Sequence, residues 1–147
     1  MKSVLRNLAA GAIAVCAFCG VAVAKTTLEF RLVVECMPGD RPVTFEGESL
    51  CVKKSNVADL TDVTSAAVGF VSGNEAIRIT LNSAGAARMK AATAHPGGRM
   101  AIIYNGVLVS APVYEGVISD FVEIDFGEHG TRLKEIAAAL KSAIRKK

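Results

Sequence analysis

Polar side chains that could carry out catalysis are few in this sequence, and they are scattered along it. Glu123 and Asp125 are two residues apart, so on a strand both carboxylates share one face, where a close pair can do acid–base chemistry. Because Glu123 and Asp125 alternate with apolar neighbours, the pattern favours a strand whose polar face, with both carboxylates, is exposed to solvent rather than a catalytic pair. Ser110 lies in Val-Ser-Ala-Pro rather than in the Gly-x-Ser-x-Gly elbow of a hydrolase, and His95 and His129 lie in predicted loops. We therefore expect no catalytic residue and no enzyme activity.

Two cysteines, Cys36 and Cys51, form the other reactive pair outside the N-terminal segment. In an exported protein such a pair favours a disulfide, and closing a loop of about 15 residues would stabilise the fold by roughly 3 kcal/mol. Two unpaired buried thiols are the alternative. A metal site is disfavoured because the sequence has no Cys-x-x-Cys spacing and its histidines are distant. We expect neither a metal nor a cofactor.

Glycine-rich segments can cradle phosphate groups, and Gly97-Gly98-Arg99 is a weak candidate of this kind. Phosphate binding by such a loop depends on the amides and dipole of a following helix. Here the two glycines open a predicted strand, so the segment does not indicate a phosphate site.

The elements that must position these residues are clearest between Ala67 and Val113. Alternating apolar residues predict a strand over Ala76–Leu81 with one buried face. A helix over Ala84–Ala94 follows, with Asn82 or Ser83 as its N-cap. Further strands and turns are predicted at Val68–Phe70, Ser72-Gly73-Asn74, Arg99–Tyr104, Asn105-Gly106 and Val107–Val113.

Three elements flank this block. Thr27–Cys36 alternates as a strand, and at a sheet edge it could take an extended peptide by strand addition. Phe121–Phe126 is a second strand, with Val122, Ile124 and Phe126 on one face. A final helix starts near Thr131, and its buried stripe is predicted to contain Leu133, Ile136, Ala137, Leu140 and Ile144.

Residues 1–24 are typical of a secretory signal peptide. Lys2 and Arg6 precede an uncharged, mostly apolar run, and Ala22-Val23-Ala24 fits a cleavage site before Lys25. The alternative is an uncleaved membrane anchor, because this run is close to the shortest spanning helix of about 17 residues. Residues 25–147 have the length of a single domain.

The charge of the chain does not point to a nucleic-acid partner. The sequence has 17 Lys and Arg against 14 Asp and Glu, and the predicted signal contains two of the cations and none of the anions. The remaining chain is nearly neutral, so nothing in its charge indicates nucleic-acid binding. No later segment is long and apolar enough to span a membrane.

Several short motifs occur in the order found in one known family. They are Phe30–Val34, Val68–Phe70, Ile79–Met89, Gly98–Val113 and the closing helix. Together they resemble the head of the first periplasmic domain of SecD, a subunit of the bacterial Sec preprotein translocase. The resemblance implies an α+β, ferredoxin-like fold with an antiparallel sheet and two main helices. It also implies a non-enzymatic role in contact with emerging preprotein.

The sequence departs from the family pattern in three ways. It contains none of the translocase membrane helices, so proton-driven work is not carried over. It has the Cys36/Cys51 pair, and it has Tyr114–Phe121 where the family has a Gly-rich loop, so a shared binding surface is not carried over either.

We therefore expect a periplasmic binding module that contacts exported or unfolded polypeptide, or the Sec translocon. One alternative is a structural accessory protein held at the membrane by an uncleaved N-terminus, the only circumstance in which we expect membrane contact. The other is a hydrolase whose dispersed site the sequence does not reveal.

Overall fold

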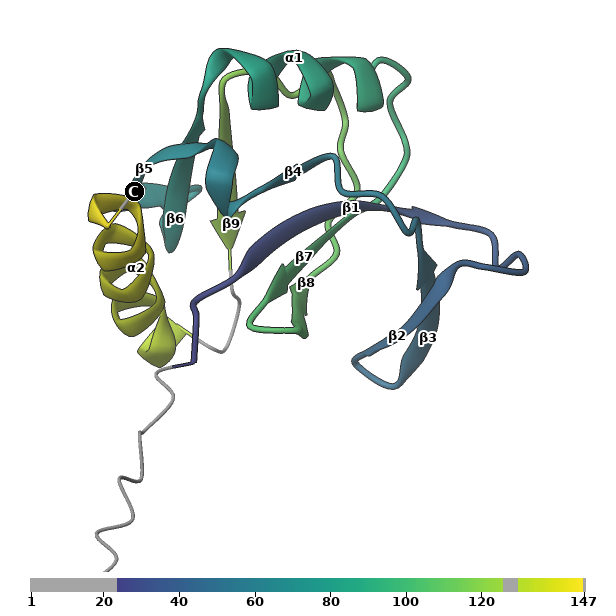
Figure 1. The fold of residues 1–147 in the computed structure, drawn as a ribbon, viewed down its shortest axis with the longest axis horizontal. Coiled ribbons are helices and arrows are strands. Elements are labelled where there is room, and N and C mark those ends of the chain that lie inside the picture. The colour runs from purple at the N-terminus through teal and green to yellow at the C-terminus, as the bar shows by residue number, and fades with distance from the viewer. Residues whose placement is uncertain (1–23, 126–129, 147) are drawn as a thin grey trace, which may run out of the picture.

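The computed structural model describes residues 24–125 and 130–146, and within them the fold is α+β with two antiparallel sheets and two α-helices (Figure 1). The larger sheet has the order β2-β3-β1-β7-β8, with β4 also paired to β1, and the smaller sheet has the order β5-β6-β9. The strands are β1 (Leu28–Val34), β2 (Arg41–Phe45), β3 (Glu48–Val52), β4 (Ala58–Asp59), β5 (Val63–Val71), β6 (Asn74–Leu81), β7 (Met100–Tyr104), β8 (Val107–Ser110) and β9 (Phe121–Asp125). The helices are η1 (Leu60–Asp62), α1 (Ser83–Ala92) and α2 (Gly130–Arg145).

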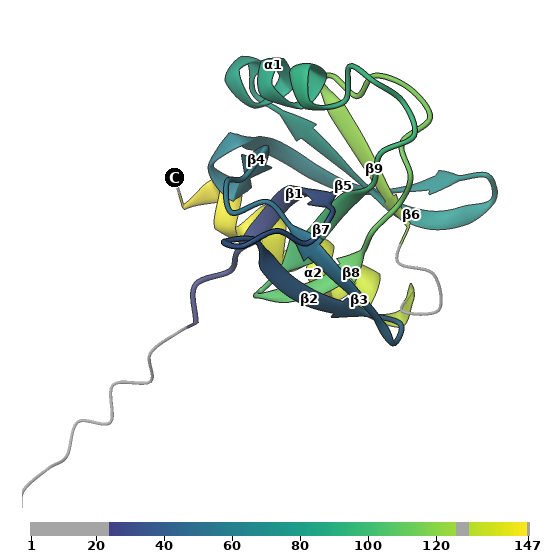
Figure 2. The ribbon, with the colours of Figure 1, turned by 90° about the vertical axis from the view of Figure 1, so that its right-hand side faces the viewer.

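The larger sheet is built from two hairpins on either side of β1. Glu46-Gly47 and Asn105-Gly106 form their turns, with both residues of each turn at positive φ, as tight hairpin turns require. Figure 2 shows the β2–β3 and β7–β8 hairpins next to each other, and the two outer strands β2 and β8 are in contact. The sheet is therefore strongly curled.

The smaller sheet follows the predicted pattern closely. β5 and β6 form a hairpin around Ser72-Gly73, and Ile77, Ile79 and Leu81 of β6 are buried, as their alternation predicted. β9 pairs with the other side of β6. The predicted position of Phe126 on this strand lies outside the described residues.

One core joins the two sheets and α2. Phe30, Ile77, Ile102 and Leu133 are among its fully buried members, and burial of each such side chain is worth about 1.5–3 kcal/mol. The predicted stripe of α2 is confirmed at Leu133, Ile136, Ala137 and Leu140, which are buried, whereas Ile144 is partly exposed.

Contacts from the first two turns of α1 fix the helix against η1. Asn82 is the N-cap, because its side chain accepts the Gly85 amide at 2.8 Å. Arg88 forms an ion pair of 2.6 Å with the buried Asp62, and the Asp62 hydrogen bond raises the pKa of Arg88. A Cβ at Gly85 would lie 2.7 Å from the Asp62 Cβ, so only glycine allows this approach without a shift.

Two expectations change with the structure. The α+β class with antiparallel pairing and two helices is confirmed, but the ferredoxin-like arrangement is not confirmed, because the strands are divided between two sheets. The proposed edge position of Thr27–Cys36 is wrong. Its strand, β1, has β3 and β4 on one side and β7 on the other, since it pairs with a segment about 70 residues later that alternation alone does not identify.

Candidate functional site

An apolar cavity of about 330 Å³ lies between β7, β9 and the segment 112–118. Buried side chains of the core, Met100, Ile102 and Val122, line it. The wall segment contributes Pro112, Val113, Tyr114, Glu115, Gly116, Val117 and Ile118, and β9 adds Phe121 and Glu123. We call this the β9 cavity.

One end of the wall segment is held by Tyr114 and Gly98. The two residues are connected by a backbone hydrogen bond from the Tyr114 amide to the Gly98 carbonyl, and the Gly97 amide donates to the Tyr114 carbonyl, both at 2.9 Å. A Cβ at Gly98 would lie 2.1 Å from the Tyr114 hydroxyl oxygen, so the ring occupies the space that glycine leaves. Gly97-Gly98 thus has a structural explanation, and Arg99 forms an ion pair with Glu48 at 3.1 Å.

The other end of the wall segment is held by Thr93, which is fully buried after α1. Its hydroxyl accepts a hydrogen bond from the Ile118 amide at 2.8 Å and lies 2.9 Å from the Met89 carbonyl, to which it donates. The segment between Tyr114 and Ile118 is therefore anchored at both ends.

The mouth of the β9 cavity carries exposed apolar side chains. Val113, Val117 and Phe121 expose 56%, 52% and 45% of their surface. Apolar residues gathered around a cavity in this way are typical of a surface that receives an apolar group from a partner.

Charged groups surround this mouth. Arg78 donates to Glu123 through Nε at 2.9 Å, and its guanidinium lies 4.9 Å from the centroid of the Phe121 ring, within cation–π distance. Glu115 lines the cavity, and Asp120 directly precedes β9. The Ser119 hydroxyl donates to Asp120 at 2.7 Å and lowers the pKa of that carboxyl, so Asp120 is ionised near neutral pH.

A larger cavity of about 790 Å³ lies between the segment Ala24–Glu29, η1 and the C-terminal half of α2. Its lining is mostly apolar, with polar groups of Asn56, Asp59 and Thr61 among it. None of the strongly exposed large apolar side chains among the described residues lines it. The exposed large apolar side chains at its mouth distinguish the β9 cavity from this one.

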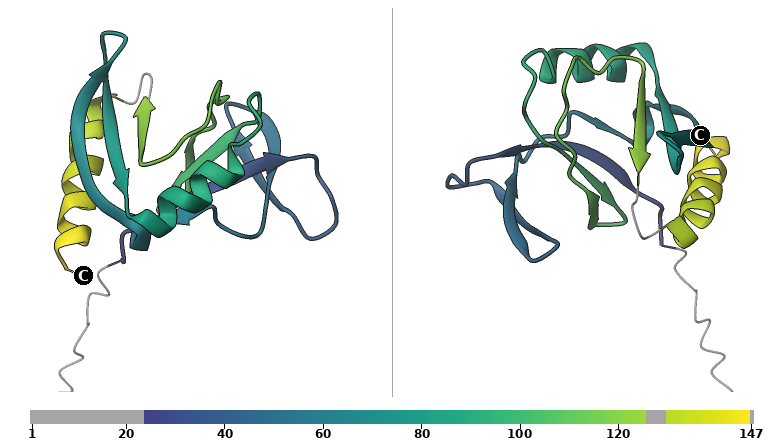
Figure 3. Two further views of the ribbon diagram at one scale, coloured as in Figure 1. Left: turned by 90° about the horizontal axis from the view of Figure 1, so that it is seen from above. Right: turned by 180° about the vertical axis from the view of Figure 1, so that it is seen from behind.

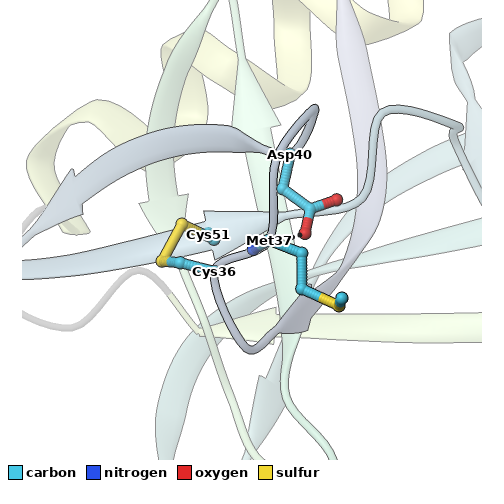
Figure 4. Close-up of a disulfide and its surroundings, with 4 residues drawn as sticks. All are labelled: Cys36, Met37, Asp40 and Cys51. Carbon is cyan, nitrogen blue, oxygen red and sulfur yellow. Dashed lines mark hydrogen bonds between the residues drawn. A yellow bond between two sulfur atoms is a disulfide. The ribbon is translucent and has the colours of Figure 1, made fainter.

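Cys36 and Cys51 are joined in a disulfide, with their Cα atoms 5.1 Å apart (Figure 4). Cys36 follows β1 and Cys51 lies in β3, so the bridge closes the loop that contains the β2–β3 hairpin. Beside it, Asp40 accepts the Met37 amide at 3.1 Å and closes the turn that leaves β1.

The residues considered for catalysis do not come together in the described structure. Ser110 ends β8 and has no hydrogen bond to a histidine or carboxylate among the described residues, and His95 is exposed in the turn after α1. Glu123 is engaged by Arg78, and Asp125 is exposed. His129 lies outside the described residues.

Within 24–125 and 130–146, no group of three or more His, Cys, Asp or Glu side chains is placed to hold a metal ion. No helix in this part of the chain is long and apolar enough to cross a membrane.

Sequence reasoning missed the β9 cavity. The sequence feature that could have indicated it is the segment Val113–Phe121, which contains several apolar residues but has neither strand nor helix periodicity. Which of these side chains face the core and which face solvent depends on the anchors at Gly98 and Thr93, which are distant in sequence.

Comparisons with known proteins agree on one family. The family model described as "SecDF, P1 head subdomain" matches residues 35–144. A crystal structure of SecDF in a super-membrane-facing form has a similar fold, with a TM-score of 0.65 and 24% identity over 81% of this chain and 19% of that chain. A structure of SecDF, described as a membrane component that enhances protein export, has a TM-score of 0.62 and 21% identity over 81% of this chain and 63% of that one. The chain thus spans less than two thirds of either structure, and no curated protein matches it.

Proposed function

The chain belongs to the SecDF P1 head subdomain family, a family related to protein transport, and we propose that it binds extended polypeptide in the periplasm without catalysing a reaction. The polypeptide is an exported or unfolded chain, or an exposed segment of the Sec translocon. The relation to SecDF makes both reasonable partners.

The observation that carries this proposal is the exposed apolar mouth of the β9 cavity. An unfolded chain offers apolar side chains that a folded protein keeps inside, and a cavity of about 330 Å³ has room for such a side chain. Val113, Val117 and Phe121 would lose water-exposed apolar surface on binding, which supplies the driving force.

The absence of catalysis is part of the proposal. A hydrolytic site needs a nucleophile, a base and an orienting group within hydrogen-bond reach. The mouth of the β9 cavity instead combines aliphatic groups with carboxylates, one of which is already paired with Arg78. Turnover that a single substitution abolishes would contradict this part of the proposal.

The periplasmic location is supported by the family, because the P1 head of SecDF is periplasmic, and by the Cys36–Cys51 bridge, which suits an oxidising compartment. The predicted signal, residues 1–24, is almost entirely outside the described residues. Intact-mass measurement of the exported protein tests it: a chain starting at Lys25 is expected. A mass that includes Met1–Ala24 would favour the membrane-anchored accessory protein.

Binding can be tested with reduced, carboxymethylated lysozyme as a permanently unfolded probe and native lysozyme as the folded comparison. We expect the unfolded probe alone to bind. Replacing Val117 and Phe121 with serine should weaken binding at least about tenfold, which corresponds to about 1.4 kcal/mol.

The matched control replaces two exposed apolar residues away from the cavity, Phe70 and Val107, with serine. This control should bind like the unsubstituted protein. Equal losses in both double variants would show a non-specific surface effect, and no binding by the unsubstituted protein would contradict the proposed function.

A further inference from the structure

Among the described residues β9 is an edge strand of the smaller sheet, next to β6 (Figure 3, left). Its residues Phe121, Val122 and Glu123 line the β9 cavity. The Leu81 amide donates to the Asp120 carbonyl at 2.8 Å, which makes these two residues a hydrogen-bonded pair of the β6–β9 ladder. Bonded and non-bonded pairs alternate along an antiparallel ladder. The backbone N–H and C=O groups of Phe121 and Glu123 therefore point away from β6.

The other long outer strands differ from β9 in their surroundings or regularity. In the larger sheet, the outer strands β2 and β8 contact each other. In the smaller sheet, β5 is the main strand against which α2 packs, and it carries a bulge between Val63 and Ser65. A bulge disrupts the regular hydrogen-bonding row that an added strand needs.

From this arrangement we infer that β9 accepts an extended polypeptide as an added strand, with an apolar side chain of that strand in the β9 cavity. A row of backbone donors and acceptors is matched best by another extended backbone. Alternate side chains of such a strand point to the same face, so those nearest the wall segment would meet Val113 and Val117. The inference rests on the proposed function and specifies its site and geometry.

The charges at this edge select the side chains of the added strand. Glu115 and Asp120 carry negative charge beside β9, whereas the nearby cation Arg78 is paired with Glu123. A strand in which apolar residues alternate with Lys or Arg therefore matches the site better than one in which they alternate with Glu.

The direct test uses an acetylated and amidated hexapeptide of alternating Val and Lys with ¹⁵N-labelled protein. Amide hydrogen exchange at Phe121 and Glu123 should slow at least about tenfold at saturation, because these groups become hydrogen-bonded. The same peptide methylated at every backbone nitrogen should not bind, and a Val–Glu peptide should bind more weakly. Binding with unchanged exchange at both amides would overturn the inference.

A substitution at Glu123 provides the second test. Glu123→Pro removes an outward N–H without removing a ladder bond to β6, which an edge strand tolerates. Glu123→Thr is the matched control, because it also loses the carboxylate and the contact with Arg78 but keeps the N–H. We expect Glu123→Pro to bind the Val–Lys peptide at least about fivefold more weakly than Glu123→Thr, the effect of one lost hydrogen bond.

The outcomes separate the two proposals. If Glu123→Pro and Glu123→Thr bind unfolded lysozyme and the peptide equally well, strand addition at β9 is wrong and polypeptide binding stands. If the unsubstituted protein binds neither probe, both proposals fail. If Glu123→Pro does not fold by circular dichroism, the exchange measurement on the unsubstituted protein decides.

Discussion

The Ile118 amide donates a hydrogen bond of 2.8 Å to the hydroxyl of Thr93, 25 residues earlier in the chain. This contact ties the wall of the β9 cavity to the end of α1. Thr93 is fully buried, so removing its hydroxyl leaves the partly buried Ile118 amide without its protein partner.

We therefore expect Thr93→Val to lower the free energy of unfolding by about 1–3 kcal/mol, measured by urea denaturation. Thr64→Val is the control, because the Thr64 hydroxyl donates to the Thr80 carbonyl at an exposed position and its loss should cost about 0.5 kcal/mol or less. Equal effects in the two variants would show that the Thr93 contact is not specially important.

Gly98→Ala should destabilise the protein, because the added Cβ would occupy the position of the Tyr114 ring. We expect a loss of about 1–3 kcal/mol, with Tyr114 displaced from the wall of the cavity. Gly116→Ala, in the same wall segment, has no neighbour within 4 Å of the added Cβ and should be nearly neutral. If Tyr114→Ala does not relieve the cost of Gly98→Ala in a double-mutant cycle, the steric explanation is wrong.

The Cys36–Cys51 bridge closes a loop with a sequence separation of 15, so replacing both cysteines with serine should cost about 3 kcal/mol. The unsubstituted protein should lose the same amount when a reductant is added, and the double variant should be insensitive to it. Thiol labelling of denatured, unreduced protein should detect no free cysteine between residues 25 and 147. Labelling at Cys36 or Cys51 would contradict the bridge.

Asp59 should contribute to the acid sensitivity of the fold. Burial by itself would raise the pKa of Asp59, but the hydrogen bonds from Thr61 and Asn56, together with the nearby Arg88 charge, more than offset this. The pKa is held below its ordinary value of 3.8. The folded state thus favours the carboxylate, and the resulting stability is complete above pH 3.8 and is lost as the pH falls through the lower folded-state pKa.

The measurement is urea denaturation between pH 6 and about pH 2.5. Asp59→Asn should be less stable than the unsubstituted protein at pH 6, and this difference should narrow below about pH 4. Glu135→Gln changes an exposed carboxyl on α2 and serves as the control. A difference for Asp59→Asn that is constant with pH would rule out this linkage.

Much of the local structure follows from short-range pattern. The Asn105-Gly106 hairpin, the buried face of β6 and the stripe of α2 were predictable because each depends on neighbouring residues in sequence. The division into two sheets was not predictable in this way. Strand partners such as β1 and β7 are far apart in sequence, and alternation indicates only that a strand has a buried face.

The candidate site was less predictable than the fold. Phe121 lies on the face of β9 opposite Val122 and Ile124, as the alternation implied. Val113 and Val117, in contrast, are apolar loop residues that would ordinarily be assigned to the core, yet the structure leaves them exposed. Their exposure depends on two anchors, Tyr114 at Gly98 and Ile118 at Thr93, which only the folded chain brings together.

The interior position of β1 has a consequence for the order in which an exported chain can fold. A chain that enters its compartment N-terminus first presents Leu28–Val34 early, but the partner strand Met100–Tyr104 arrives only after most of the chain has crossed. The local β2–β3 hairpin can form at once, whereas the central pairing of the larger sheet must wait. In a chain that emerges from its N-terminus, the larger sheet can therefore be completed only after Met100–Tyr104 has appeared, and Leu28–Val34 lacks its β7 partner until then.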